Sequence, residues 1–175
     1  MSAQKNPPPI QADDHVRGDA DAPVTIIEYG DYDCPHTRAA QANVDQLMAG
    51  GGVRVVFRYF PLRNLHASAE ILARIAEASA RQGLFWPMHD HLMKHRRGVQ
   101  RDDILSDAAE IGLDLPAVQA LLADEGVAAR IERDVEGGRA AGVHSTPSFF
   151  FNGVLHDGHY DLDTLSEQLR RARSR

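Results

Sequence analysis

The sequence predicts a mixed α/β fold in which a β-α-β unit and a β-β-α unit are separated by a block of helices. Two apolar, β-branched segments at residues 24–31 and 53–61 flank an amphipathic segment near the N-terminus. Helical periodicity then extends from residue 65 to 142, and strand character returns only at 147–158. The 175 residues, 43% apolar and 25% charged, fit one globular domain of ordinary composition.

The proline and glycine residues at the helix ends indicate the bounds of the β-α-β unit. Residues 24–31 have the length of a buried strand, and Pro35 suits the first position of the helix that follows. Apolar residues at helical spacing continue to Met48, and the run Gly50-Gly51-Gly52 ends this helix. Residues 53–61 form the second strand. Strand, helix and strand in this order imply a right-handed parallel crossover.

The later elements follow from similar signals. Between 65 and 142 we expect several short helices, most of them ended by glycine. Asn152-Gly153 is a strong hairpin turn signal inside the strand region 147–158. The C-terminal segment from Asp161 onward is expected to be an amphipathic helix capped by aspartate.

These elements define the expected domain organisation. Residues 15–62 and 143–173 form the α/β domain, and 63–142 form a helical insertion. The proline run at 7–9 predicts that residues 1–14 are an extended, mobile tail.

Charge and composition exclude several classes of function. The net charge of −6, without a basic stripe, argues against nucleic-acid binding. No segment is apolar and long enough to span a bilayer, and the N-terminus lacks the apolar core of a signal peptide, so we expect a cytoplasmic protein with no membrane association. A single cysteine excludes an internal disulfide.

That cysteine, Cys34, lies where a strand is expected to end and a helix to begin. A thiol at a helix start faces unpaired backbone N–H groups and the positive end of the helix dipole, which favour the thiolate. Pro35 opens the helix, and a protonated His36 would favour the thiolate further. Asp31 and Asp33 would oppose it if they lie close. The alternative is that Cys34 is only a small buried apolar residue.

The chain resembles DsbA-like thiol–disulfide oxidoreductases from about residue 15 to about 170. The segments that carry the resemblance occur in the right order and spacing: "DAPVTIIEYGDYDCPHT", "VVFRYFPL", "QGLFWPMHDHLM" and "GVHSTPSFFFNG". The resemblance implies a thioredoxin-like fold with an inserted helical subdomain, which agrees with the predicted order of elements.

The resemblance also implies roles for particular residues. Cys34 corresponds to the nucleophile, and Pro147 corresponds to a proline that follows a cis peptide bond and faces the active sulfur. In the family, the backbone before this proline binds an extended substrate by strand addition. We therefore expect Pro35, Ser145, Thr146 and Pro147 to form the substrate-binding part of the site.

Thr37 departs from the family pattern, because the resolving cysteine is expected at this position. A self-contained dithiol oxidase is therefore excluded. Glu28 matches the buried acid that manages the proton of the second sulfur, and its role here is left open. The Thr37 hydroxyl could donate a hydrogen bond to the Cys34 thiolate. Alternatively, Thr37 only caps the first helical turn and the site is decaying.

The function predicted from these residues is that of a monothiol thiol–disulfide oxidoreductase. Cys34 would form a mixed disulfide with a protein or small-molecule substrate, and glutathione or another external thiol would resolve it. His36, Thr37 and Glu28 complete the candidate catalytic set. No bound cofactor is expected, and the oligomeric state is expected to be a monomer or weak dimer.

Three other functions remain as alternatives. Cys34 could be a redox sensor or peroxidatic cysteine that is oxidised to sulfenic acid. The groove beside Pro147 could be a non-catalytic peptide-binding module. Glutathione conjugation is a further possibility on this fold, although transferases resemble the Cys-Pro-His segment less.

Several histidines raise the question of a metal site. His91 and His95 lie four residues apart on an expected helix, with His89 and Asp90 beside them, and this spacing can bind zinc. Without a third ligand, surface histidines are the commoner interpretation, so no metal is predicted. His144 could approach Cys34 as a base, but an exposed loop position is the simpler interpretation.

Overall fold

The structure is a computed structural model that describes residues 6–95 and 101–174. Within them, five strands form one sheet in the order β1-β3-β2-β4-β5. Strands β2 and β3 are parallel, and the other neighbouring pairs are antiparallel. The strands are β1 (His15–Gly18), β2 (Val24–Gly30), β3 (Val53–Tyr59), β4 (Ser148–Phe151) and β5 (Val154–Leu155).

The predicted β-α-β and β-β-α units are both present. Helix α1 (Pro35–Ala49) connects the parallel strands β2 and β3, and the hairpin of β4 and β5 leads into α7 (Leu162–Arg173). The hairpin turn contains Asn152, whose φ is 47°, and Gly153, whose φ is 83°. Positive φ at both positions is what an Asn-Gly turn provides. The side chain of Asp161 caps α7 by accepting from the N–H of Thr164.

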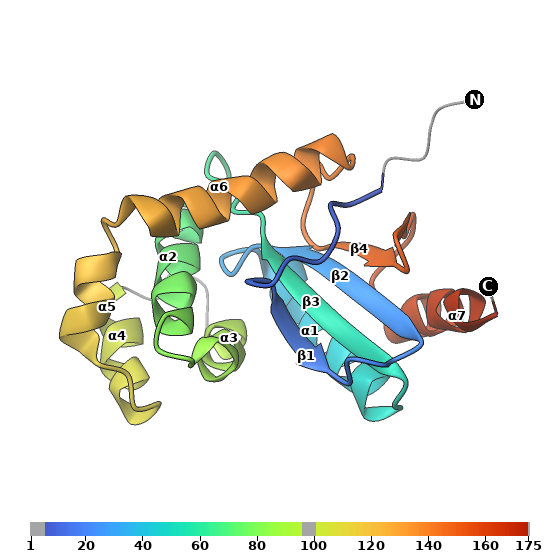
Figure 1. Ribbon diagram of the computed structural model, residues 1–175, viewed down its shortest axis with the longest axis horizontal. Coiled ribbons are helices and arrows are strands. Elements are labelled where there is room, and N and C mark those ends of the chain that lie inside the picture. Colours follow the sequence, from blue (N-terminus) through green and yellow to red (C-terminus); the bar gives the residue numbers. More distant parts are fainter. Residues whose placement is uncertain (1–5, 96–100, 175) are drawn as a thin grey trace.

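Both faces of the sheet are covered, which explains why β2 is buried along most of its length. Helices α1 and α7 form an apolar cluster with one face, and the helical insertion forms a second cluster with the other face. Figure 1 shows α6 extending from the insertion across the end of the sheet, and α7 beside β4. The insertion consists of α2 (Ala69–Ala80), α3 (Phe85–Lys94), α4 (Arg101–Glu110), α5 (Leu115–Leu121) and α6 (Glu125–Ala140).

Strand β1 was not expected from the sequence. Its four residues pair antiparallel with the outer side of β3, from His15 opposite Phe57 to Gly18 opposite Arg54. The segment is short, and its sequence HVRG lacks the alternation that identifies a strand. Pairing with β3 therefore decides its conformation.

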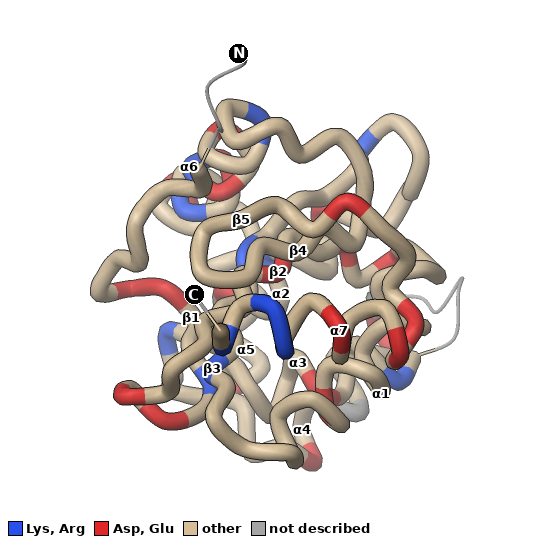
Figure 2. Tube along the Cα trace, turned by 90° about the vertical axis from the view of Figure 1, so that its right-hand side faces the viewer, with Lys and Arg blue, Asp and Glu red and all other residues tan. Residues whose placement is uncertain are grey.

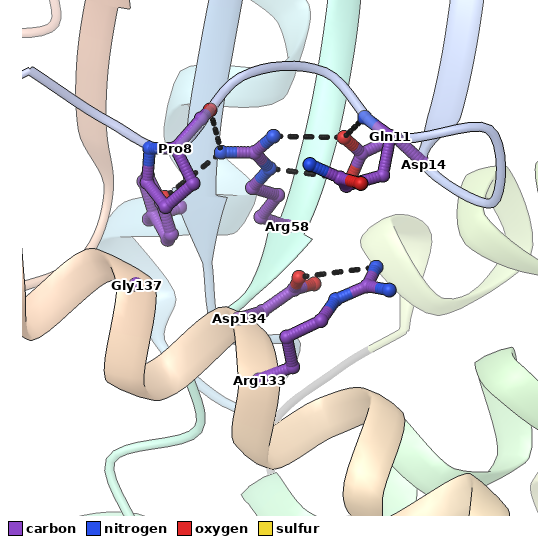
Figure 3. A pocket seen from close by; sticks show the side chains of 8 residues that line it. Pro8, Gln11, Asp14, Arg58, Arg133, Asp134 and Gly137 are labelled. Atoms are coloured by element: carbon purple, nitrogen blue, oxygen red, sulfur yellow. Dashed lines mark hydrogen bonds and ion pairs between the residues drawn. The ribbon is translucent and has the colours of Figure 1, made fainter.

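The described part of the expected tail, residues 6–14, lies against the fold. Arg58 of β3 donates hydrogen bonds to the carbonyl oxygens of Pro8 and Pro9, at 2.8 and 2.9 Å, and pairs with Asp14. Figure 3 shows the Arg58 guanidinium between these groups, with Asp134 of α6 on the other side of a cavity of about 300 Å³. Polar contacts that no local pattern reveals thus hold a proline-rich segment that was expected to be mobile.

Candidate functional site

Cys34 lies at the corner between β2 and α1, as the sequence predicts. It is the N-cap of α1, with φ −76° and ψ 121°, and Pro35 is the first residue of the helix. The Cys34 N–H donates to the carbonyl oxygen of Asp31 at 3.0 Å, and the Cys34 carbonyl accepts from Arg38 N–H at 3.2 Å. The residue is only 2% exposed. The turn that presents the thiol is therefore fixed by its own backbone.

The loop before β4 brings Thr146 and Pro147 to this thiol. The Cys34 Sγ lies 3.4 Å from the carbonyl oxygen of Thr146 and donates a hydrogen bond to it. The peptide bond between Thr146 and Pro147 is cis. Thr146 is buried, Pro147 is half-buried and Ser145 is exposed. Two motifs that are 112 residues apart in the sequence thus meet at one sulfur atom.

The backbone of this loop offers unused hydrogen-bonding groups. Among the described residues, no partner accepts from the N–H groups of His144, Ser145 or Thr146. The Thr146 hydroxyl is buried without a hydrogen-bond partner there. A segment with free N–H groups beside a thiol can pair with an added extended strand.

Thr37 is fully buried on the first turn of α1, three residues after Cys34. Its hydroxyl oxygen accepts a hydrogen bond from the N–H of Asp31 at 3.3 Å. No hydrogen bond joins the Thr37 and Cys34 side chains in the described structure. Thr37 therefore supports the turn before the cysteine rather than the sulfur itself.

His36 and Pro35 lie on the exposed side of the turn. The His36 Nδ1 is 2.7 Å from the hydroxyl of Tyr160, which lies between β5 and α7. The Asn43 side chain donates to the Tyr160 carbonyl at 2.9 Å and fixes the same loop to α1. The His36 ring thus contacts Tyr160, and among the described residues it forms no hydrogen bond with Cys34.

Glu28 is a buried carboxyl group on β2. It shares a face of the strand with Gly30, and a Cβ added at Gly30 would lie 3.1 Å from the Thr37 methyl group. The Glu28 Oε1 has no hydrogen-bond partner among the described residues. Burial, together with the negative charge of Asp45, raises the pKa of Glu28 to about 8. Both protonation states are therefore accessible near neutral pH.

Asp31 organises the turn before Cys34, a role that the sequence analysis missed. Its carboxylate accepts from Asp33 N–H at 2.8 Å, from Leu62 N–H at 3.0 Å and from the His66 Nδ1 at 2.7 Å. Asp33 in turn accepts from the N–H of Ser68 at 3.1 Å. Two aspartates that were expected only to oppose the thiolate thus join its turn to the β3–α2 connection.

His66 was not among the predicted site residues, although the topology offers a signal for it. Neighbouring parallel strands end at the same edge of a sheet, so the connections that follow β2 and β3 must lie side by side. A histidine in the β3–α2 connection is therefore expected near the cysteine that follows β2.

The three histidines that were considered as metal ligands make other contacts in the structure. His89 is buried, and its ring nitrogens contact the Tyr32 hydroxyl at 3.0 Å and the Gln41 amide oxygen at 3.3 Å. Burial, with Arg17 and His15 nearby, lowers the pKa of His89 well below its usual value. The rings of His91 and His95 contact each other, with centroids 4.2 Å apart. The described residues hold no group of three or more potential ligands suited to a metal ion, and His144 is exposed in its loop.

Along the chain trace in Figure 2, acidic and basic residues are interspersed and the basic residues form no continuous stripe. Among the described helices, none combines the length and the apolar character that crossing a bilayer requires.

Sequence comparisons place this fold and site among known proteins. Residues 11–171 match the family model described as Thioredoxin. The chain is 41% identical over 166 residues to the Na⁺/H⁺ antiporter NhaA 1 of Salinispora arenicola, and 37% identical over 169 residues to the antiporter NhaA of Herminiimonas arsenicoxydans. These matches cover 94% and 95% of this chain but 26% and 27% of the antiporters.

Solved structures give the same fold. A thioredoxin-like oxidoreductase from Silicibacter pomeroyi is 30% identical, with a TM-score of 0.85 over 94% of this chain and 95% of that one. BdbD from Bacillus subtilis is 19% identical, with a TM-score of 0.84 over 98% of each chain. The thiol-disulfide exchange protein α-DsbA2 from Wolbachia pipientis is 22% identical, with a TM-score of 0.80 over 91% of this chain and 87% of that one. The chain therefore belongs to the thioredoxin family and has the fold of DsbA-like thiol–disulfide oxidoreductases.

Proposed function

We propose that the protein is a monothiol thiol–disulfide oxidoreductase, in which Cys34 forms a mixed disulfide that an external thiol such as glutathione resolves. The observation that carries this proposal is the placement of the chain's single cysteine. Cys34 caps α1 and lies 3.4 Å from the carbonyl oxygen that precedes Pro147, while Thr37 occupies the position of a second cysteine. One sulfur is thus presented for exchange without an internal partner.

The proposed reaction has two exchange steps. The Cys34 thiolate attacks one sulfur of a substrate disulfide, a new S–S bond forms as the old one breaks, and the displaced thiolate takes up a proton. A second thiol then loses its proton, attacks the mixed disulfide and releases Cys34 as thiolate. With a glutathionylated protein and glutathione, the net products are the reduced protein and oxidised glutathione.

This chemistry needs a pool of reducing thiols, so the proposal includes a reducing compartment such as the cytoplasm. Glutathione enters as a co-substrate. The proposed substrates are protein or small-molecule disulfides, handled by a monomer or weak dimer. We take no ion transport over to this chain from the antiporters, because the match covers about a quarter of their length.

The backbone before Pro147 supplies the substrate-binding part of the proposal. An extended substrate segment paired with the free N–H groups of Ser145 and Thr146 would place its sulfur beside Cys34. Because Cys34 is 2% exposed, this loop must shift slightly when the mixed disulfide forms. Glu28, with its pKa near 8, can hold or release a proton over the pH range in which thiols react.

The test combines intact mass with turnover. We expect exposure to oxidised glutathione to add one glutathionyl group to the protein, and excess thiol to remove it. Turnover of a glutathione mixed disulfide should be lost in Cys34→Ser, whereas Pro35→Ala, which keeps the thiol, should retain part of it. Turnover in Cys34→Ser would refute the thiol mechanism.

Restoring a second cysteine tests whether the site is adapted to a single thiol or has lost its function. Thr37→Cys places a second sulfur on the first turn of α1, and we expect this variant to gain reduction of insulin disulfides. If it gains no such activity although it forms an internal disulfide, the loop at Pro147 does not bind substrates as proposed.

The free backbone groups of residues 144–146 also favour a second candidate, a non-catalytic peptide-binding module. This candidate predicts that peptides bind equally well before and after Cys34 is alkylated, and that no glutathione mixed disulfide is turned over.

A further inference from the structure

A groove lies between the β3–α2 connection and the C-terminal half of α6, with a cavity volume of about 440 Å³. We call it the Leu65 groove. The residues that matter for its chemistry are Phe60, Pro61, Leu62, Leu65, Val135 and Arg139. With Arg63 and Asn64, eight residues line the groove, and five of them are apolar, so it combines a mainly apolar lining with two cations, Arg63 and Arg139.

Leu65 is exposed far more than the packing of the fold explains. Leu65 is 71% exposed, whereas the next most exposed large apolar residues among those described, Ile10 and Leu155, are each 37% exposed. An apolar side chain that projects beside an apolar groove indicates a contact surface for a partner.

Arg139 supplies the charge of the groove. It is exposed, and it forms no ion pair or side-chain hydrogen bond with any described residue. Arg63, the other cation of the groove, is already paired with Glu70 at 2.7 Å and with Glu132 at 2.9 Å. Arg139 is therefore the cation available to an incoming carboxylate.

Both walls of the groove lead to Cys34. On one side, the Leu62 N–H binds the Asp31 carboxylate, and the Asp31 carbonyl accepts from Cys34 N–H. On the other side, α6 ends at Ala140, and the chain continues for a few residues to Thr146, whose carbonyl contacts the Cys34 sulfur. Residues 144–146 thus connect the end of α6 that carries Arg139 to the Cys34 sulfur, so a polypeptide paired along them can continue from Cys34 to Arg139.

We propose that the Leu65 groove binds the segment of a polypeptide substrate that flanks its disulfide, with an apolar side chain against Leu65 and a carboxylate at Arg139. This inference rests on the proposed function and adds a substrate class to it: disulfides in acidic, partly apolar sequence.

The experiment compares glutathionylated peptides that differ only in charge. One series carries glutamate at successive positions after the modified cysteine, and a matched series carries lysine at the same positions. Glutathionylated free cysteine is the substrate without a flanking segment. The wild type is expected to prefer the best glutamate peptide over its lysine counterpart by about 3- to 5-fold in kcat/KM, as for one exposed ion pair.

Three variants assign this preference to the groove. Arg139→Glu should reverse the preference, and Lys94→Glu, which makes the same charge change at an exposed residue of α3 outside the groove, should leave it unchanged. Leu65→Ser should lower kcat/KM about 10-fold for both peptides, because an apolar contact is lost. All three variants should turn over glutathionylated cysteine at the wild-type rate.

The outcomes separate this inference from the proposed function. If Arg139→Glu keeps the wild-type preference while glutathionylated cysteine is turned over, the groove assignment is wrong and the enzyme assignment stands. If the wild type turns over no substrate, the enzyme assignment fails. Binding of the unmodified glutamate and lysine peptides to Cys34-alkylated protein, measured by fluorescence anisotropy with the same variants, then decides whether the groove binds them.

Discussion

Glu28 combines complete burial with an unpartnered carboxyl oxygen, so its ionisation acts directly on stability. Burial raises its pKa from 4.5 to about 8. Below pH 4.5 the group is protonated in both the folded and the unfolded chain, and its ionisation costs nothing. Between pH 4.5 and 8 only the unfolded chain loses the proton, so the free energy of unfolding falls by up to about 1.4 kcal/mol per pH unit.

We therefore expect Glu28→Gln to gain stability relative to the wild type as the pH rises. Urea unfolding at pH 5 and pH 8 measures this, and the difference between variant and wild type should increase by at least about 1 kcal/mol between the two. A buried amide without partners has its own cost, but that cost does not depend on pH. A difference that stays constant from pH 5 to pH 8 would show that Glu28 is ionised in the folded protein throughout.

Asp31 holds three donors, one from its own turn and two from the β3–α2 connection, and an amide cannot replace it fully. In Asp31→Asn the side-chain nitrogen is a donor, so at least one of these donors loses its acceptor. We expect a loss of about 1–3 kcal/mol in the free energy of unfolding. Asp33→Asn is the matched control, because its one donor, Ser68 N–H, can still bind the remaining oxygen. Urea midpoints that shift equally in both variants would contradict this account of the turn.

At the scale of the elements, a ring of β3 and the first turn of α1 approach β2 so closely at Gly30 that no side chain fits there. A Cβ at this position would lie 2.4 Å from Cε2 of Phe57, a ring that is fully buried, and 3.1 Å from the Thr37 methyl group. Since Phe57 has no room to withdraw, we expect Gly30→Ala to lower the free energy of unfolding by about 1–3 kcal/mol. Thermal unfolding checks this. An unchanged melting temperature would mean that α1 can move away from the sheet without cost.

The elements differ in how far their own sequence determines them. Strand β2, helix α1 and the Asn152-Gly153 turn carry strong local signals, and the structure confirms them. Strand β1 carries none, because pairing with β3 decides its conformation. Local pattern thus suffices for elements that bury an apolar face or contain a turn residue, and it fails for a short edge strand.

At the scale of the whole molecule, the same distinction applies to the candidate site. Cys34 and the Thr146-Pro147 pair were recognisable because each lies in a distinctive motif, and the fold brings them together. The orientation of His36 toward Tyr160, the contact between Asp31 and His66, and the Leu65 groove were not predicted. Each depends on which side chains of distant segments meet, and single-sequence patterns do not contain that information.

A buried ion pair holds the segment at residues 6–14 to the sheet, and Asp14 of this segment also lies 3.4 Å from Arg130 of the insertion. The side chains of Arg58 and Asp14 are 3% and 0% exposed and lie 2.7 Å apart. Burial raises the pKa of Asp14, but the hydrogen bonds from Arg58 and from the Gln11 N–H, together with the charges of Arg58 and Arg130, outweigh it and hold this pKa below its usual 3.8. Removing Arg58 leaves the buried Asp14 carboxylate with the longer contact to Arg130, at 3.4 Å, and the N–H of Gln11. Removing Asp14 leaves the Arg58 guanidinium without a carboxylate partner among the described residues. In Arg58→Met the carbonyls of Pro8 and Pro9 also lose their donor.

We expect Arg58→Met and Asp14→Leu each to lower the free energy of unfolding by about 3–5 kcal/mol. The double variant should lose clearly less than the sum, because neither charge is then stranded. Arg54→Met, on the same strand but partly exposed, should cost less than about 1 kcal/mol. The measurement is urea unfolding at pH 7 of the two single variants, the double variant and the control.

The same pair gives a pH dependence. The contribution of Asp14 to stability is present above pH 3.8 and is lost as the pH falls below it, so the difference in the free energy of unfolding between wild type and Arg58→Met should narrow in acid. Additive losses, or a gap that persists in acid, would show that the segment at residues 6–14 contributes nothing through this pair.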